Sequence, residues 1–189
     1  MDAASDPKGS APVERYGLVA RLFHWVVVLM VAIMLPVGIA MTSYGFEEIR
    51  DELFILHKGT GAVLLVVVLA RLVWRVVAGA PDPPPHWSQL QRRLVALTHG
   101  TLYILLLTMT VTGYVRTVGG GFPIELLEAL GIPPLIPEIG DTAETVAVVH
   151  KFTAYALTGL VGVHVARVFH DQWVEKKEAL KRMWPPIGG

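Results

Sequence analysis

The sequence predicts an all-α membrane protein built as a bundle of four transmembrane helices. Of its 189 residues, 53% are hydrophobic and only 17% are charged, and the mean hydropathy is +0.52, well above an ordinary soluble domain. The apolar residues gather in four blocks, each long enough to cross a hydrocarbon core of about 30 Å. The alternating pattern of a membrane β-strand is absent, and a helix pairs its own backbone groups within lipid.

The four blocks define the domain organisation. We expect a polar head at residues 1–17 and a membrane domain at 18–170, with spans at about 18–42, 53–78, 90–115 and 145–169, and then a tail at 171–189. The length of the first block and the polar head before it argue against a cleaved signal peptide. Between the third and fourth blocks, Pro123 to Leu130 has the spacing of a short helix, which either lies on the membrane or packs as a lid.

The distribution of basic residues predicts the orientation. The formal net charge is zero, so the chain has no single basic patch for nucleic acid. Most lysines and arginines fall in the head, the second connection and the tail, whereas the first and third connections hold Arg50 and Arg116. Under the positive-inside rule, both termini face the cytoplasm. The outer loops are acidic and are expected to attract cationic partners.

The histidines carry the main functional signal. The chain has no cysteine, which excludes disulfides, thiolate-bound zinc, cysteine-bound iron–sulfur clusters and c-type haem attachment. Ionisable groups inside membrane spans are costly and are by default functional candidates. Five of the seven histidines lie in the expected spans, namely His24, His57, His99, His150 and His164.

Their spacing predicts two layers of histidines. His150 and His164 are fourteen residues apart, a rise of about 21 Å with both rings on one helix face. His57 lies at the depth of His150, and either His24 or His99 lies at the depth of His164. Facing imidazoles in an apolar four-helix interior suit two b-type haems, one above the other. Interhelical hydrogen bonding is the alternative use of these rings, and zinc is disfavoured because the layers are too far apart and lack carboxylates.

Basic side chains flank these histidines. Lys58 and Lys151 follow His57 and His150 directly, and Arg21 precedes His24 by three residues. These cations are placed either to contact haem propionates or to snorkel towards the membrane surface.

Together these segments resemble the bacterial cytochrome b561 family, which is related to the membrane cytochrome b subunits of nickel–iron hydrogenases. The resemblance covers residues 16 to 175 and is carried by Arg21–Trp25, Leu56–Gly59, Arg71–Arg75, His99 with Leu102–Tyr103, Thr112–Gly113, Val149–Lys151 and Val163–Ala166. It implies a multi-pass protein of the bacterial inner membrane with two haem b groups. Their axial ligands would be His24, His57, His150 and His164, and His99 would then be a neighbour that does not ligate iron.

The resemblance also implies electron transfer between a quinone pool and a donor or acceptor outside the membrane. Some stand-alone members look like superoxide:ubiquinone oxidoreductases, and the length of the chain favours that branch. The acidic outer loops would repel superoxide unless Lys58, Lys151 and Arg116 form a local positive funnel. The alternative is a non-catalytic membrane-anchoring subunit, which passes electrons to or from a basic periplasmic cytochrome or an oxidoreductase subunit.

A quinone site has no defining motif. We place it near the cytoplasmic haem, where the arginine and histidine side chains could bind carbonyl oxygens or deliver protons: Arg92, Arg93, His99 and His170.

Overall fold

The computed structural model describes residues 15–85, 87–175 and 180–184. Its four long helices are α1 (Leu18–Ala40), α2 (Arg50–Ala78), α3 (Gln89–Gly119) and α5 (Thr142–Phe169). Each of them is long and apolar enough to cross a membrane. Among the described residues there is no β-strand. The predicted class, a protein with four membrane-spanning helices, is therefore confirmed.

Shorter helical segments join or extend these four. A 3₁₀ turn at Glu47–Ile49 leads into α2, and the short helix α4 (Glu125–Ala129) lies between α3 and α5. A π-helical turn, His170–Val174, prolongs α5, and a 3₁₀ turn, Leu180–Arg182, follows further along the chain. The first predicted span, 18–42, runs two residues beyond the end of α1. The other three were shorter than the helices, because the helical hydrogen bonding of α2, α3 and α5 continues into polar flanking residues that a hydropathy pattern excludes.

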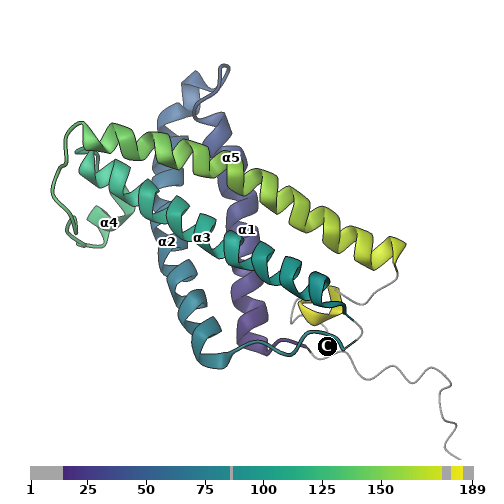
Figure 1. The fold of residues 1–189 in the computed structure, drawn as a ribbon. Helices are drawn as coiled ribbons and strands as arrows, with labels where there is room; N and C mark the ends of the chain where they lie inside the picture. The colour runs from purple at the N-terminus through teal and green to yellow at the C-terminus, as the bar shows by residue number, and fades with distance from the viewer. Residues whose placement is uncertain (1–14, 86, 176–179, 185–189) are drawn as a thin grey trace, which may run out of the picture.

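The helices form two antiparallel pairs. α1 packs along α2, α3 packs along α5, and α2 also meets α3. Figure 1 shows the α3/α5 pair crossing in front of the α1/α2 pair. A small apolar core of Val27, Val31, Leu64 and Val68 holds the first pair together, and Leu106 of α3 packs against it.

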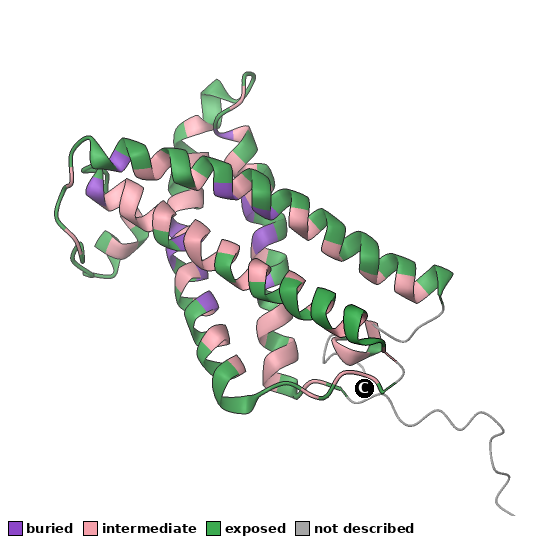
Figure 2. Cartoon of the chain, in the orientation of Figure 1, coloured by how far each residue is buried: buried purple, intermediate pink, exposed green. Residues whose placement is uncertain are grey.

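Most large apolar side chains of the bundle point outwards. Figure 2 shows exposed and half-buried residues along all four long helices, with buried residues concentrated where the two pairs cross. Leu29 on α1 and Val66 on α2, for example, are 62% and 66% exposed. A water-soluble protein rarely exposes so much contiguous apolar surface, so these faces are suited to lipid.

The short helix α4 packs as a lid on α2. Ile124, directly before α4, is 5% exposed. A Cβ atom added to Gly59 of α2 would lie 3.3 Å from Cβ of Leu126, so α4 approaches α2 at a position that has no side chain. This helix therefore packs on the bundle, as the lid hypothesis predicts.

Residues 180–184 fold back onto the beginning of α1. The indole Nε1 of Trp25 donates a hydrogen bond to the carbonyl oxygen of Met183 at 2.6 Å. The backbone N–H of Tyr16 donates to the carbonyl oxygen of Arg182 at 3.1 Å. The two ends of the described chain therefore lie at the same end of the bundle.

Parts of the predicted head and tail fall outside the described residues. These are residues 1–14 of the head, residues 176–179 and 185–189 of the tail, and His86 of the second connection.

Candidate functional site

His57 of α2 and His150 of α5 face each other across the bundle. Their ring centroids are 6.4 Å apart and the ring planes are 85° apart. Two imidazoles that bind one metal ion from opposite sides, through bonds of about 2.0–2.1 Å, have centroids about 6 Å apart. The observed separation therefore suits a bis-histidine metal centre. The structure thus brings together the predicted pair His57 and His150, which we call the outer pair, and we call the layer of His24, His99 and His164 the inner layer.

Hydrogen bonds orient the ring of His150. Its Nδ1 lies 3.0 Å from the carbonyl oxygen of Met109 and 3.2 Å from the hydroxyl of Thr112, both on α3. Because the carbonyl can only accept, it fixes the proton on Nδ1 and leaves Nε2 with a free lone pair. This is the usual arrangement of a histidine that binds a metal.

Nδ1 of His57 is buried and has no hydrogen-bond partner within the described part of the chain. A buried polar atom without a partner is costly and calls for an explanation. A ligand bound at this ring would supply one.

Two glycines provide space for these rings. A Cβ atom added to Gly38 of α1 would lie 3.1 Å from Cε1 of His57, and one added to Gly113 of α3 would lie 3.0 Å from Cε1 of His150. Each imidazole therefore occupies the space that a side chain would fill on the neighbouring helix.

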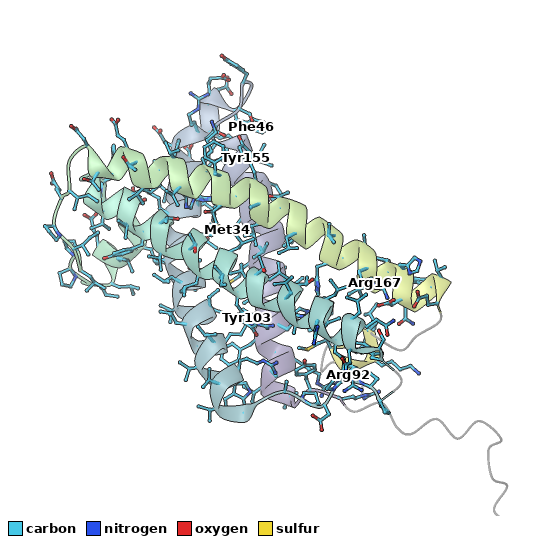
Figure 3. The ribbon with its side chains drawn as sticks, viewed as in Figure 1. Met34, Phe46, Arg92, Tyr103, Tyr155 and Arg167 are labelled. Atoms are coloured by element: carbon cyan, nitrogen blue, oxygen red, sulfur yellow. The ribbon has the colours of Figure 1, made fainter. Side chains whose placement is uncertain are left out.

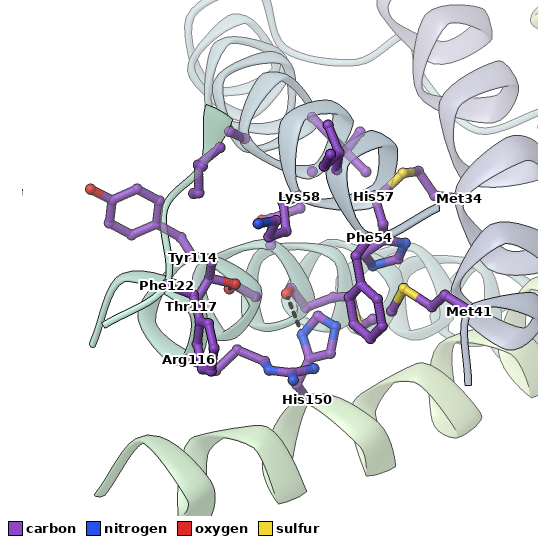
Figure 4. A pocket seen from close by; sticks show the side chains of 18 of the residues that line it. Met34, Met41, Phe54, His57, Lys58, Tyr114, Arg116, Thr117, Phe122 and His150 are labelled. Atoms are coloured by element: carbon purple, nitrogen blue, oxygen red, sulfur yellow. Dashed lines mark hydrogen bonds between the residues drawn. The ribbon is translucent and has the colours of Figure 1, made fainter. Parts of the chain in front are cut away.

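A cavity of about 620 Å³ surrounds the two rings, which is within the usual range for a cofactor site. Apolar side chains such as Met34 and Phe54 line most of it, and Arg116 and Lys58 also border it. Figure 4 shows the cations on the side of the cavity near Tyr114, and the two imidazoles between that side and the methionines. An apolar cavity with two facing imidazoles and cations at one edge fits haem, whose macrocycle is apolar and whose propionates are anionic.

An ion pair fastens the lid beside this cavity. The Nζ of Lys58 donates to Oε1 of Glu125 at 2.6 Å and to the carbonyl oxygen of Pro123 at 2.8 Å. The hydrogen bond from Lys58 lowers the pKa of Glu125 below its ordinary value, because it favours the ionised carboxylate. Lys58, predicted to contact a propionate, is here engaged with α4.

The inner layer brings together three histidines from three helices. The rings of His99 and His164 have centroids 5.4 Å apart, and His24 lies close enough to both to interact with them electrostatically. Nδ1 of His99 is 2.7 Å from the carbonyl oxygen of Val95, which leaves Nε2 free. The sequence spacing left open whether His24 or His99 lies beside His164. In the structure both are near it, and the ring of His99 contacts it.

His24 makes a different contact. Its Nδ1 lies 3.3 Å from Nη2 of Arg71 on α2. A guanidinium only donates, so Nδ1 of His24 accepts this hydrogen bond.

The remaining predicted cations take varied positions. Nη1 of Arg21 lies 3.4 Å from the carbonyl oxygen of Trp184, and Lys151 is exposed on α5. Neither residue lines the outer cavity. Their contact with propionates remains a prediction.

The predicted quinone-site residues are dispersed. Arg92 donates to the carbonyl oxygens of Trp87, Pro84 and Pro85, and so holds the proline-rich loop. Arg93 is exposed. His170 lies 3.7 Å from a carboxylate oxygen of Glu175 in the π turn. Of the four, His99 alone is placed beside the inner histidines.

Sequence reasoning did not identify several residues of the site. The places of Gly38 and Gly113 depend on which helices neighbour each histidine, and no local motif carries that information. Arg71 is an ionisable residue within an expected span, which marks it as a functional candidate, but the sequence analysis used it only as part of the segment Arg71–Arg75. Arg116 was considered only for superoxide, and it borders the outer histidines directly.

Comparison with known proteins identifies the family. The model of a family described as "Prokaryotic cytochrome b561" matches residues 15–186. The chain is 29% identical over 174 residues to "Cytochrome b561 homolog 2" of Escherichia coli (strain K12), with 90% of this chain and 91% of the relative covered. It is 22% identical over 176 residues to "Probable superoxide oxidase CybB" of Yersinia pestis, with 93% and 99% covered. The chain therefore belongs to the prokaryotic cytochrome b561 family, whose members are electron-transfer proteins of the bacterial membrane that bind b-type haem.

Proposed function

We propose that this protein is a di-haem b cytochrome that carries electrons across the bacterial inner membrane, between the quinone pool and a donor or acceptor on the outer side. The observation that carries the proposal is the facing pair His57 and His150, whose centroids are 6.4 Å apart in a largely apolar cavity. A second cluster of histidines lies in the other half of the bundle. Two sites at different depths would divide electron transfer across the membrane into two short steps.

The chain's own residues hold the two groups. We assign His57 and His150 to the outer haem and His24 and His164 to the inner haem, with His99 as the neighbour. Bound haem supplies a one-electron iron couple. We assign Arg21, Lys58 and Lys151 to the propionates, and add Arg116 because it lines the outer cavity.

We place both termini in the cytoplasm. The positive-inside rule supports this orientation, and the contact between Tyr16 and Arg182 supports a common side for the two ends. The His57/His150 layer then lies towards the periplasm.

Superoxide is the outer donor that one relative's name suggests. In this reaction each superoxide gives up one electron and leaves as dioxygen. Two electrons and two protons then convert ubiquinone to ubiquinol. Arg116 borders the outer cavity, where its positive charge would attract a small anion.

An acidic outer surface favours a second function, that of an anchoring subunit without catalysis of its own. The first connection carries Glu47, Glu48, Asp51 and Glu52, and the third carries Glu125, Glu128, Glu138 and Asp141. Such a surface suits a basic periplasmic cytochrome or an oxidoreductase subunit. Recovery of a stable complex in gentle detergent would favour this function over superoxide oxidation.

The quinone site belongs to the inner half in this proposal. His99 is its best-supported member, because its ring contacts His164. Arg92, Arg93 and His170 remain proposed members at the cytoplasmic end.

The test is a dithionite-reduced minus oxidised visible spectrum of the detergent-purified protein, with pyridine haemochrome quantification. We expect two b-type haems per chain. One haem per chain would refute one of the two pairs. A colourless protein made with adequate haem supply would refute the electron-transfer proposal.

A further inference from the structure

Arg71 lies inside the bundle beside the inner histidines. One of its nitrogens, Nη2, is 3.3 Å from Nδ1 of His24. Its Cζ lies 5.5 Å from the ring centroid of Tyr103 on α3, a residue labelled in Figure 3. The charge of Arg71 also acts on His164 and His99. Arg75 acts on His99 as well, but it donates a hydrogen bond to the carbonyl oxygen of Gly79 at 3.0 Å. The positive charge of Arg71 therefore contacts His24 and acts on His99 and His164.

No carboxylate side chain in the described part of the chain forms an ion pair with Arg71. The parts of the four long helices at 18–40, 60–78, 89–119 and 145–169 contain no Asp or Glu. The second terminal nitrogen of the guanidinium, Nη1, is buried and lacks a hydrogen-bond partner among the residues that the structure describes. The contacts that Arg71 does make, with an imidazole and the face of a phenol ring, are neutral.

A neutral residue would be cheaper at this position. A charge within a membrane span is costly and is usually paired or turned towards water. A contact with an aromatic face recovers only part of the desolvation cost. A structural role alone thus accounts poorly for a permanent cation here.

We propose that Arg71 is the residue that raises the electron affinity of the inner site and so sets electron flow from the outer histidine layer towards the inner one. This inference rests on the proposed di-haem function. Adding one electron to the inner site makes that site one charge more negative, and a cation in a poorly screened interior stabilises the added charge. The argument holds whether His24 or His99 is the partner of His164, because the charge of Arg71 acts on both.

The outer layer differs in this respect. Lys58 is neutralised by Glu125 at 2.6 Å. Arg116 borders the outer cavity and acts on His57 and His150, but it lies in the last turn of α3, and a charge at the end of a membrane-spanning helix is screened by water and ions more than one in the bundle interior. The unbalanced buried charge at Arg71 thus favours the electron on the inner side, next to the proposed quinone site.

The experiment is a potentiometric titration of the visible spectrum of the full-length, haem-loaded protein and of its Arg71→Gln and Arg71→Lys variants. We expect R71Q to reduce the equilibrium constant for reduction of one of the two haems at least tenfold. For a one-electron couple this lowers the midpoint potential of that haem by about 59 mV. The other haem should keep its potential. R71K, which keeps the charge, should restore most of the shift, and the shift in R71Q should persist at high salt.

Arg167→Gln is the matched control. Arg167 is on α5, three residues after His164, but its side chain is 53% exposed and paired with Asp171 at 2.8 Å. Figure 3 shows it near the end of α5. Removing this positive charge should leave both potentials within error of the wild type.

The outcomes separate this inference from the function on which it rests. Two haems with the same potentials in wild type and R71Q would overturn the role of Arg71 and leave the di-haem proposal intact. A wild-type protein without two haems would overturn both. If R71Q lost one haem, retention of that haem by R71K would support the requirement for charge, whereas its loss from R71K as well would show a purely structural role and overturn the inference.

Discussion

Gly38 and Gly113 occupy equivalent places in the two helix pairs. Gly38 of α1 makes room for the ring of His57 on α2, and Gly113 of α3 makes room for the ring of His150 on α5, with closest approaches of 3.1 and 3.0 Å to an added Cβ. Each outer histidine therefore packs one side of its ring against the other helix of its own pair. The opposite side of the ring faces the other pair.

Substitution of either glycine by alanine should weaken the outer site. A Cβ at about 3 Å would push the imidazole from its position, because contacts this short are tighter than nearly all those that real Cβ atoms make. We expect G38A and G113A to lose much of one haem per chain in the haemochrome assay. Gly159 and Gly162 of α5 have nothing within 4 Å of an added Cβ, so G159A and G162A should keep both haems. Full haem content in G38A and G113A would contradict this account.

Removal of an outer imidazole should have a larger effect. His57→Ala and His150→Ala each remove one of the two facing rings, so each should reduce haem from two per chain to one. His170 provides the control, since it is exposed at the end of α5, and His170→Ala should retain two. Normal spectra in both H57A and H150A would refute the outer site.

The inner site offers a comparison between two histidines. His24→Ala should remove the inner haem, whereas His99→Ala should keep both haems and slow quinone reduction several-fold. The structure makes this comparison sharp, because His99 and not His24 forms a ring contact with His164. Loss of haem in H99A with normal haem in H24A would exchange the two roles. The readouts are haem content and the rate of ubiquinol formation.

The lid should respond to acid. Lys58 lowers the pKa of Glu125, so the ion pair stabilises the closed lid above the ordinary pKa of a glutamate, and this stabilisation is lost as the pH falls through the lowered value. Hydrogen exchange of residues 123–130 should therefore be pH-independent near neutrality, after correction for intrinsic rates, and should accelerate only in acid.

Glu125→Gln should remove that dependence on acid. Because Glu125 is partly exposed, the change in lid opening near neutral pH should be at most about fivefold. Glu128→Gln is the matched control on the same helix, since Glu128 is exposed. An acid response that survives in E125Q would assign the transition to another group.

The sequence predicted the four spans and the outer pair because both depend on regular helices. Once residues 53–78 and 145–169 are helical and start on the same side, His57 and His150 must lie at similar depth. The helix period alone also places His150 and His164 on one face.

Sequence alone was less informative wherever the outcome depends on how the two pairs cross. Whether His24 or His99 approaches His164 is decided by the angle between the pairs, which hydropathy does not encode. The same is true of Arg71, whose environment is built from α1 and α3 as well as its own helix. The fold-back of residues 180–184 was missed because its hydrogen bonds use backbone carbonyls, which leave no trace in side-chain patterns.

That fold-back imposes an order on biogenesis. The carbonyl oxygens that receive Trp25 and Tyr16 belong to residues 183 and 182, and translation reaches them only after all four membrane helices have been made. The N-terminal end of the first helix therefore lacks these two hydrogen bonds until the last helix has been made. Closure of this end is thus coupled to completion of the whole bundle, and a chain interrupted before residue 180 would display an open start of α1 to cellular quality control.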